Sequence, residues 1–452
     1  MHFLKQPVAP SFAMIVVIGK LLKKAIFLLF IYLLYFQAIQ AQPGFVKVKG
    51  HQFVLNNHAY YYIGANYWYG GLLGLIKDPK KGKGRLQKEL DFLSSRGVNN
   101  LRVMAGVEGS GLINGVKRVS PALQTSQGNF DENILTGLDL LLYEMGKRNM
   151  KAVIYLSNNW EWTGGFLQYL NWNGLLSDSI LRKKMNWDEN RDYVKQFYSC
   201  KPCITAFNKQ VKTIITRRNT ITGKLYVNDP SIMAWEMANE PRPMRPEAIT
   251  AFTQWINETA DFIKSLDANH LVTTGSEGEM GNENIQTFEA IHSSKNVDYL
   301  TIHIWPKNWG WFSDTSIAKG FNTILSNTKA YITKHASVAN RLNKPLVIEE
   351  FGLPRNNHSF LPAASTTLRN NYYRQIFQIF NASVQNKREI AGCNFWGFSG
   401  SGRAAENQDF WWTEGDDYMA DPPPEEQGLN SVFDNDTSTW KLISSFTKNI
   451  KK

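Results

Sequence analysis

Short apolar runs of four to six residues recur eight times along the chain, and segments with helical periodicity separate them. Such runs are typical of strands that are buried on both faces. Strands are predicted at residues 61–66, 100–104, 152–156, 233–238, 272–275, 299–304, 346–350 and 391–396. Helices are predicted at residues 85–96, 134–147, 206–217, 246–265, 285–292, 317–341, 366–385 and 438–450.

This alternation predicts an α/β fold, and eight strands are the number that closes into a (β/α)8 TIM barrel. No linker or repeat divides the chain after residue 45, so we expect a single barrel domain over residues 42–452. Phe45–Leu55 and His58–Tyr62 flank Asn56-Asn57, which predicts an N-terminal β-hairpin that plugs the barrel floor. The alternative is an open doubly wound sheet. It is disfavoured because no Gly-rich phosphate loop follows the first strand.

The first 41 residues have the pattern of an export signal. Lys20, Lys23 and Lys24 precede a twelve-residue apolar run, and small residues then lead to a predicted cleavage after Ala41. The run is shorter than the roughly 20 residues that span a bilayer. We therefore predict a cleaved signal peptide at residues 1–41 rather than a retained anchor, and a secreted protein, extracellular or periplasmic, without membrane contact.

The composition is that of a globular chain with an excess of aromatic residues. It is 43% hydrophobic, 20% charged and 13% aromatic, with fourteen Trp, which excludes a disordered or collagen-like chain. The formal net charge of +11 falls to about +7 without the leader, which carries four Lys and no acidic residue. The basic residues are not interleaved with aromatic residues along one helical face, so nucleic-acid binding is not expected.

Three Cys are too few for a disulfide framework in a chain of this length. Cys200 and Cys203 have the spacing of a redox motif but lie outside a thioredoxin-like context. In an exported protein we expect them to form a local disulfide, and we expect Cys393 to be a buried thiol.

Polar and aromatic side chains follow the predicted strands at the barrel end where such folds place their sites. Glu240 follows the fourth strand and Glu350 ends the seventh. Glycoside cleavage requires two carboxyl groups, because one protonates the leaving oxygen while the other attacks the anomeric carbon or activates water. No Cys or paired His accompanies them, so a zinc site is not expected. We expect the protein to use neither a metal ion nor a cofactor. Other strand ends contribute Arg102, Asn159, Trp160, Glu277, His303, Trp305 and Trp396.

The segments at 234–242 (AWEMANEPR) and 347–352 (VIEEFG) resemble glycoside hydrolase family 5, and most closely its endo-β-1,4-mannanases. The resemblance runs in order through essentially all of residues 45–452, and it implies a retaining hydrolase that acts on a β-mannan type polysaccharide. We expect the protein to be a monomer. Further segments that look like this family lie at residues 64–68, 101–103, 158–160, 275–278, 302–306 and 421–431.

The resemblance implies a role for each matching residue. Glu240 becomes the acid/base and Glu350 the nucleophile, while Arg102 would keep Glu350 ionised and its pKa low. Asn239 would bind the 2-hydroxyl of the −1 sugar, whose subsite His303 would shape. The remaining substrate-binding residues are Trp396 under the −1 ring, Arg242 and Glu277 on the aglycone side, and Trp305, Trp68, Asn159 and Trp160.

Three further positions need interpretation. Glu349 and Glu350 are neighbours that point to opposite faces of a strand, and spacing alone does not decide which faces the cleft; the family pattern favours Glu350. Glu236 shares the strand parity of Glu240 but lies deeper, so we interpret it as a buried, paired, structural carboxylate. Trp305 stands where the family usually has Tyr, and its N–H donates a hydrogen bond but accepts none.

The expected function is that of a retaining endo-β-1,4-mannanase that cleaves internal bonds of mannan, glucomannan or galactomannan. The alternatives are an endo-β-1,4-glucanase or an exo-β-mannosidase of the same family, because glucose and mannose differ only at the 2-hydroxyl. A catalytically silent carbohydrate-binding barrel is a further alternative. The presence of both Glu240 and Glu350 argues against it.

Overall fold

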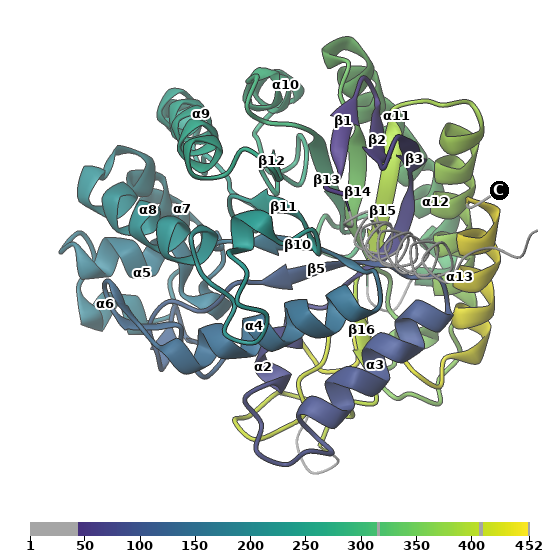
Figure 1. Cartoon of the computed structure of the whole chain (residues 1–452), viewed down its shortest axis with the longest axis horizontal. Coiled ribbons are helices and arrows are strands. Elements are labelled where there is room, and N and C mark those ends of the chain that lie inside the picture. The colour runs from purple at the N-terminus through teal and green to yellow at the C-terminus, as the bar shows by residue number, and fades with distance from the viewer. Residues whose placement is uncertain (1–43, 314–316, 406–409, 451–452) are drawn as a thin grey trace, which may run out of the picture. The chain divides into compact units, whose positions relative to one another are not determined.

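The computed structural model describes residues 44–313, 317–405 and 410–450, so the predicted signal peptide lies outside the described residues. Residues 45–452 form one compact unit. Its eight parallel strands follow the order β12-β11-β10-β5-β4-β15-β14-β13, with helices around them (Figure 1), which confirms the predicted TIM barrel. The strands are β4 (Tyr62–Asn66), β5 (Asn100–Met104), β10 (Lys151–Tyr155), β11 (Ile232–Glu236), β12 (Leu271–Thr273), β13 (Leu300–Ile304), β14 (Leu346–Phe351) and β15 (Ile390–Phe395).

The barrel closes between β12 and β13 through single hydrogen bonds rather than a regular ladder. Asp298 N donates to Val272 O at 2.8 Å, and His303 N donates to Glu277 O at 3.0 Å. These bonds satisfy backbone groups that a sheet edge would otherwise leave unpaired. They also bring Glu277, which follows β12, beside His303 of β13.

The helices that cover the barrel bury one apolar face each. In α9, for example, Phe252, Trp255, Ile256 and Ile263 recur at helical spacing and are all buried. All eight predicted helices are present. They are α3 (Lys83–Ser95), α4 (Glu132–Lys147), α8 (Lys201–Ile215), α9 (Ile249–Leu266), α10 (Ile285–Ser293), α11 (Ile317–Leu342), α12 (Thr367–Gln385) and α13 (Thr437–Asn449). No helix in the described ranges is long and apolar enough to cross a membrane.

The barrel floor is covered by a three-stranded antiparallel sheet, β1 (Lys47–Lys49), β2 (Gln52–Leu55) and β3 (His58–Tyr60). The predicted hairpin is its β2–β3 half, and Asn56 and Asn57 make the turn with φ of 51° and 64°. Phe53 of β2 is fully buried, and its ring lies 5.2 Å from that of Tyr299 at the base of β13. The predicted plug is therefore confirmed, with one additional strand.

The connections after the strands carry short elements that the hydrophobic pattern does not predict. Cys200 and Cys203 form the predicted disulfide where α8 begins, and Cys393 is a buried thiol. The additional helices and strands are α2 (Gly70–Leu73), α5 (Gly165–Trp172), α6 (Asp178–Arg182), α7 (Trp187–Val194), β6 (Leu112–Ile113), β7 (Val116–Lys117), β8 (Gln124–Ser126), β9 (Asn129–Phe130), β16 (Phe398–Gly400) and β17 (Val432–Phe433). The 3-10 turns are η1 (Glu161–Thr163), η2 (Lys195–Ser199), η3 (Tyr226–Asn228), η4 (Pro246–Ala248) and η5 (Asn356–His358).

Candidate active site

Glu240 and Glu350 meet at the mouth of the barrel, where they line a cavity of about 710 Å³. Glu240 follows β11 with a left-handed φ of 51°, and Glu350 lies near the end of β14. One oxygen of each carboxyl and Nδ1 of His303 lie within 4.8 Å of one another. Most of the remaining lining is aromatic or polar: Trp160, Trp162, Trp187, Trp305, Trp309, Trp396, Asn239, Arg242, Glu277, Asn308 and Glu425.

Arg102 of β5 connects the floor of this cavity to the barrel interior. Its Nε and Nη2 donate to Glu236 at 2.8 and 2.5 Å, so one edge of the guanidinium binds this buried carboxylate through two bonds. Nη2 also donates to Asn239 Oδ1 at 2.7 Å, and Nη1 donates to Glu350 Oε1. One guanidinium thus fixes both the deep carboxylate and the Glu350 carboxylate.

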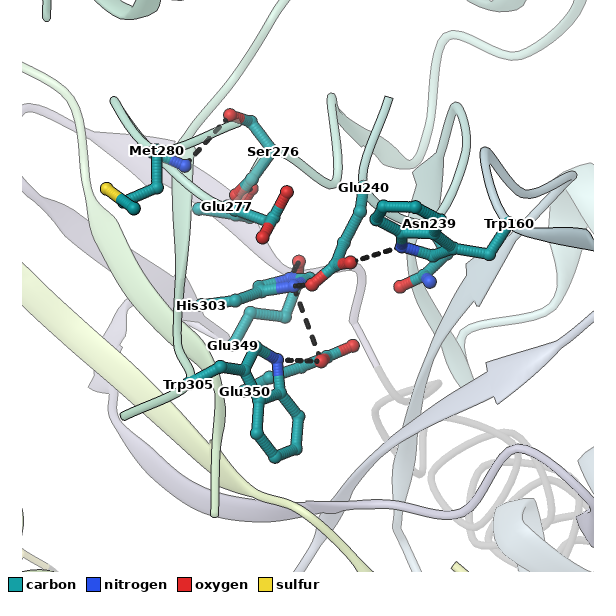
Figure 2. A network of polar contacts seen from close by, with 12 residues as sticks. Trp160, Asn239, Glu240, Ser276, Glu277, Met280, His303, Trp305, Glu349 and Glu350 are labelled. Atoms are coloured by element: carbon teal, nitrogen blue, oxygen red, sulfur yellow. Dashed lines mark hydrogen bonds and ion pairs between the residues drawn. The ribbon is translucent and has the colours of Figure 1, made fainter. Parts of the chain in front are cut away.

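Both carboxyl oxygens of Glu240 form hydrogen bonds with residues of two other strand ends (Figure 2). Trp160 Nε1 donates to Oε2, and His303 Nδ1 lies 2.6 Å from Oε1. Asn239 beside it donates from Nδ2 to Asn158 Oδ1 at 3.0 Å, which orients its amide. Glu240 is therefore held in a fixed geometry although it lies in a loop.

Arg242 and Glu277 form a partly buried ion pair at one side of the cavity. Arg242 Nη2 donates to Glu277 Oε1 at 2.8 Å, and the guanidinium lies 4.7 Å from the centre of the Trp160 ring. The Trp187 ring of α7 stacks on Trp160 at 6.1 Å and 26°. Two indoles and a guanidinium thus form a continuous wall that leads outward from Glu240.

Trp305 and Trp396 lie on the opposite side, next to Glu350. Trp305 Nε1 donates to Glu350 Oε2 at 3.1 Å (Figure 2), and its ring meets Trp396 edge-to-face at 5.7 Å and 76°. Trp305 thus makes the hydrogen bond that is expected of a donor at this position. Glu350 therefore accepts from two donors, the charged Arg102 and the neutral Trp305.

The family model described as GH family 5 beta-mannosidase-like matches residues 43–452. The chain belongs to this family of glycoside hydrolases. Two relatives from Arabidopsis thaliana are similar over most of both chains. Mannan endo-1,4-beta-mannosidase 1 is 30% identical over 79% of this chain and 82% of its own length, and mannan endo-1,4-beta-mannosidase 2 is 31% identical over 82% of each.

Solved family 5 structures agree with this assignment. The crystal structure of a glycoside hydrolase family 5 mannosidase from Rhizomucor miehei is 32% identical, with a TM-score of 0.80 over 90% of this chain and 98% of that chain. A mutant of the same enzyme has been solved in complex with mannosyl-fructose. An endo-1,4-beta-mannanase from the same organism, 23% identical with a TM-score of 0.64, shows the shared fold.

Burial dominates the electrostatics of this family 5 site. It raises the pKa of Glu240, while Arg242, the Trp160 N–H and Arg102 oppose the increase. It also raises the pKa of Glu350; Arg102 opposes that increase and Glu240 adds to it. The low pKa that the resemblance implies for Glu350 is therefore wrong, because burial outweighs the effect of Arg102, which is shared with Glu236, and the neighbouring buried carboxyls add to the increase. Burial lowers the pKa of His303 to about 4, so its imidazole is neutral near pH 7.

Most of the predicted site residues of this hydrolase lie together, and two differ in placement. The Trp68 indole is buried and donates to Ala420 O at 2.8 Å, and its ring packs edge-to-face on Trp162 at 5.5 Å, so Trp68 lies behind the cavity lining rather than in it. Asn159 is buried behind the lining, and neither polar atom of its amide has a hydrogen-bond partner among the described residues. Glu236 is buried and paired with Arg102, as predicted.

The cavity of this hydrolase also contains residues that are not found by the strand-end rule, which places site residues directly after the barrel strands. Trp187 and Met280 line it, although Trp187 belongs to a helix inside a long loop. The available signal for Trp187 is its position as the first residue of a helix that begins with a capping box, formed by Asn186 and Glu189.

The atoms of Glu240, His303 and Glu350 that lie within 4.8 Å of one another are also of the types that bind metals. We interpret them as an acid–base arrangement rather than as metal ligands. The same atoms take part in hydrogen bonds within the cluster and with Arg102, Trp160 and Trp305. Two carboxyls and one imidazole held in this way have the chemistry of proton transfer and nucleophilic attack at an anomeric carbon.

Proposed function

We propose that the protein is a retaining β-mannan hydrolase that cleaves internal β-1,4-mannosidic bonds by double displacement, with Glu240 as acid/base and Glu350 as nucleophile. The observation that carries this proposal is the spacing of the two carboxyls, whose oxygens lie within 4.8 Å. Inverting enzymes need about 6.5–9.5 Å between the carboxyls to admit a water, whereas retaining enzymes need only about 5–5.5 Å.

The surroundings of the two carboxyls support different roles for them. Glu350 accepts from the cationic Arg102 and from Trp305, which favours the ionised form that attacks carbon. Among the described residues, no guanidinium donates a hydrogen bond to Glu240, and burial favours its protonated form. Burial raises the pKa of both carboxyls, so we assign the proton to Glu240 because, of the two, Glu350 alone accepts a hydrogen bond directly from Arg102.

The names of the relatives support mannan as the substrate, and the lining supports a neutral polysaccharide. Six of the lining side chains are indoles, which stack on the apolar faces of pyranose rings. Arg242, Glu277 and Trp187 would bind the sugars on the leaving-group side, while Asn239, His303 and Trp396 would bind the −1 sugar. We further propose that residues 1–41 act as a cleaved signal and that the protein works outside the cytosol as a monomer. The Cys200–Cys203 disulfide is consistent with an oxidising compartment.

An exo-acting β-mannosidase is the second candidate. The Rhizomucor miehei structure that aligns at a TM-score of 0.80 is named a mannosidase, and it is more similar to this chain than the endo-mannanase from that organism. Pro422, Pro424 and Glu425 also line the cavity, so the loop after β15 borders the site.

The test is digestion of mannan, glucomannan, galactomannan and a soluble cellulose derivative, with analysis of product length and of the first-formed anomer. Short manno-oligosaccharides in the β configuration are expected. Mannose as the sole product would show exo action instead of endo action. A first-formed product in the α configuration would refute retention. Glu240→Gln and Glu350→Gln should each lower kcat by at least about 100-fold. Glu279→Gln is the matched control, because this carboxyl lies in the same loop as Glu277 but pairs with Lys334.

A further inference from the structure

Glu349, the neighbour of the proposed nucleophile, contacts the catalytic cluster from behind. Its side chain is buried and is not part of the cavity lining. The imidazole of His303 lies between it and Glu240 (Figure 2). His303 Nδ1 is 2.6 Å from Glu240 Oε1 and 3.4 Å from Glu350 Oε2, while Nε2 is 3.5 Å from Glu349 Oε2. One ring therefore connects Glu349 to both catalytic carboxyls.

A neutral imidazole carries a single N–H, and the partner of one ring nitrogen decides which nitrogen holds it. If His303 carries the hydrogen on Nε2, Nδ1 is an acceptor and draws the Glu240 proton onto Oε1, away from the cleft. If it carries the hydrogen on Nδ1, Oε1 accepts, and the Glu240 proton is left on Oε2. This oxygen is on the side of Trp160, which lines the cavity. Only the second tautomer presents the proton to a leaving group.

The charges around Glu349 favour its neutral form. Arg102 is the cation that faces it, with Nε 3.7 Å from Oε2, but Arg102 already binds Glu236 and Glu350 at shorter distances. A third ionised carboxylate would give this buried cluster two uncompensated negative charges, which burial makes strongly unfavourable. Burial and Glu236 accordingly raise the pKa of Glu349. The titratable and charged groups that interact with it are Arg102, Glu236, Glu350, His303, Tyr62 and Tyr299.

We propose that Glu349 is a positioning residue that stays protonated and donates its O–H to His303 Nε2, and so holds His303 in the Nδ1–H tautomer. The Nδ1–H then donates to Glu240 Oε1 and leaves the acid proton on Oε2. The inference rests on the proposed function, because it assigns how Glu240 is prepared to act as the acid. The distance of 3.5 Å is at the long end for a hydrogen bond, as catalytic hydrogen bonds often are before substrate binds.

Two substitutions separate this role from simple packing. Glu349→Gln keeps a neutral donor for Nε2, so kcat/KM for mannan oligosaccharides should fall by no more than about threefold, with both limbs of the pH profile unmoved. Glu349→Met keeps the volume but removes the donor, so kcat should fall about 10- to 100-fold while KM changes little. For an aryl mannoside with an activated leaving group, which needs little protonation, Glu349→Met should lower kcat/KM by less than about threefold.

Glu108→Met is the matched control for the loss of a buried carboxyl. Glu108 is fully buried and accepts from Ser157 and Gln210 outside the catalytic cluster. The Glu108→Met substitution should lower stability without changing the ratio of kcat/KM between mannan oligosaccharides and the aryl mannoside. In ¹⁵N spectra, the histidine signal that is absent in His303→Asn should show a protonated Nδ1 and an unprotonated Nε2.

A protonated Nε2 in that spectrum would overturn the inference. So would an alkaline limb of Glu349→Gln that moves to lower pH by about one unit, since that shift would mean that an ionised carboxylate had been removed. Equal losses on both substrates in Glu349→Met would also refute the tautomer role. If the unaltered protein hydrolyses no mannan substrate, the proposed function fails instead, before any variant is compared.

Discussion

Replacing Trp305 with Phe removes one hydrogen bond and little else from the cleft. The indole N–H donates to Glu350 Oε2 at 3.1 Å, while the ring packs edge-to-face against Trp396. Phe retains an aromatic ring at that contact and has no donor. The substitution therefore tests how far the position that distinguishes this chain from the usual family pattern adjusts the proposed nucleophile.

A hydrogen bond to a charged group contributes about 1.5–3 kcal/mol, and the lower value suits Trp305 because it is partly exposed. Since about 1.4 kcal/mol corresponds to one pKa unit, losing the bond should raise the pKa of Glu350 by about one unit. Activity requires Glu350 ionised, so the acid limb of kcat/KM should move to higher pH by that amount. The Trp305 N–H also lowers the pKa of Glu240, so the alkaline limb should move in the same direction.

The assay is the pH dependence of kcat/KM on a manno-oligosaccharide, fitted to two ionisations. Trp309→Phe is the matched control, because this indole lines the same cavity but packs on Trp311 and Tyr331. The reasoning is refuted if the acid limb of Trp305→Phe stays in place. It is also refuted if Trp309→Phe produces an equal shift, which would attribute the effect to lost aromatic volume.

Three other outcomes follow from the contacts. Arg102→Met should lower the free energy of unfolding by about 3–5 kcal/mol, measured in urea, because Glu236 would be left buried without its guanidinium; an unchanged midpoint would contradict this. Trp187→Ala should weaken the Kd for long manno-oligosaccharides about three- to tenfold while leaving stability unchanged, since the side chain is 49% exposed; equal loss for mannobiose would argue against an outer subsite. Replacing both Cys200 and Cys203 with Ser should cost only about 2 kcal/mol of stability, because the disulfide closes a very short loop. A loss of about 4 kcal/mol or more, which is the size expected for a disulfide that closes a long loop, would show that the two side chains also have a packing role.

The barrel could be predicted because its strands have an unambiguous pattern. Each is a short apolar run buried on both faces, and each of the eight lies within two residues of its predicted bounds. The short elements inside the βα loops could not be found in the same way. Helix α6 has five residues and β6 has two, which is too short for any periodicity to appear.

The strand-end rule explains which site residues could be predicted. Glu240, Glu350, His303 and Trp305 are fixed by the barrel itself, so their order in the sequence determines their place in space. Trp187 depends on how a loop of several small helices folds back over the barrel mouth, and the barrel does not determine that path.

Trp68 and Glu350 show what a pattern of residue types leaves out. Both residues lie at strand ends and are therefore predicted to belong to the site, yet the loop after β15 covers Trp68. The pKa of Glu350 depends first on its burial and then on Arg102 and the buried carboxyls around it, and these are properties of the assembled cluster. The order of residues in the sequence predicts which side chains belong to the site. Their burial and the partners that they share determine their protonation states.

Because Arg102 is shared, Glu236 affects how the two proposed catalytic carboxyls, Glu240 and Glu350, take different roles. A guanidinium bound only to Glu350 would stabilise its charge strongly and make it a weak nucleophile. Because Arg102 also binds Glu236 through two bonds, its charge is partly neutralised before it reaches Glu350. Glu236 thus holds the Arg102 side chain in place and also weakens the effect of its positive charge on Glu350. Glu236, although it touches no substrate, should therefore affect the acid limb of the pH profile as well as the stability of the barrel.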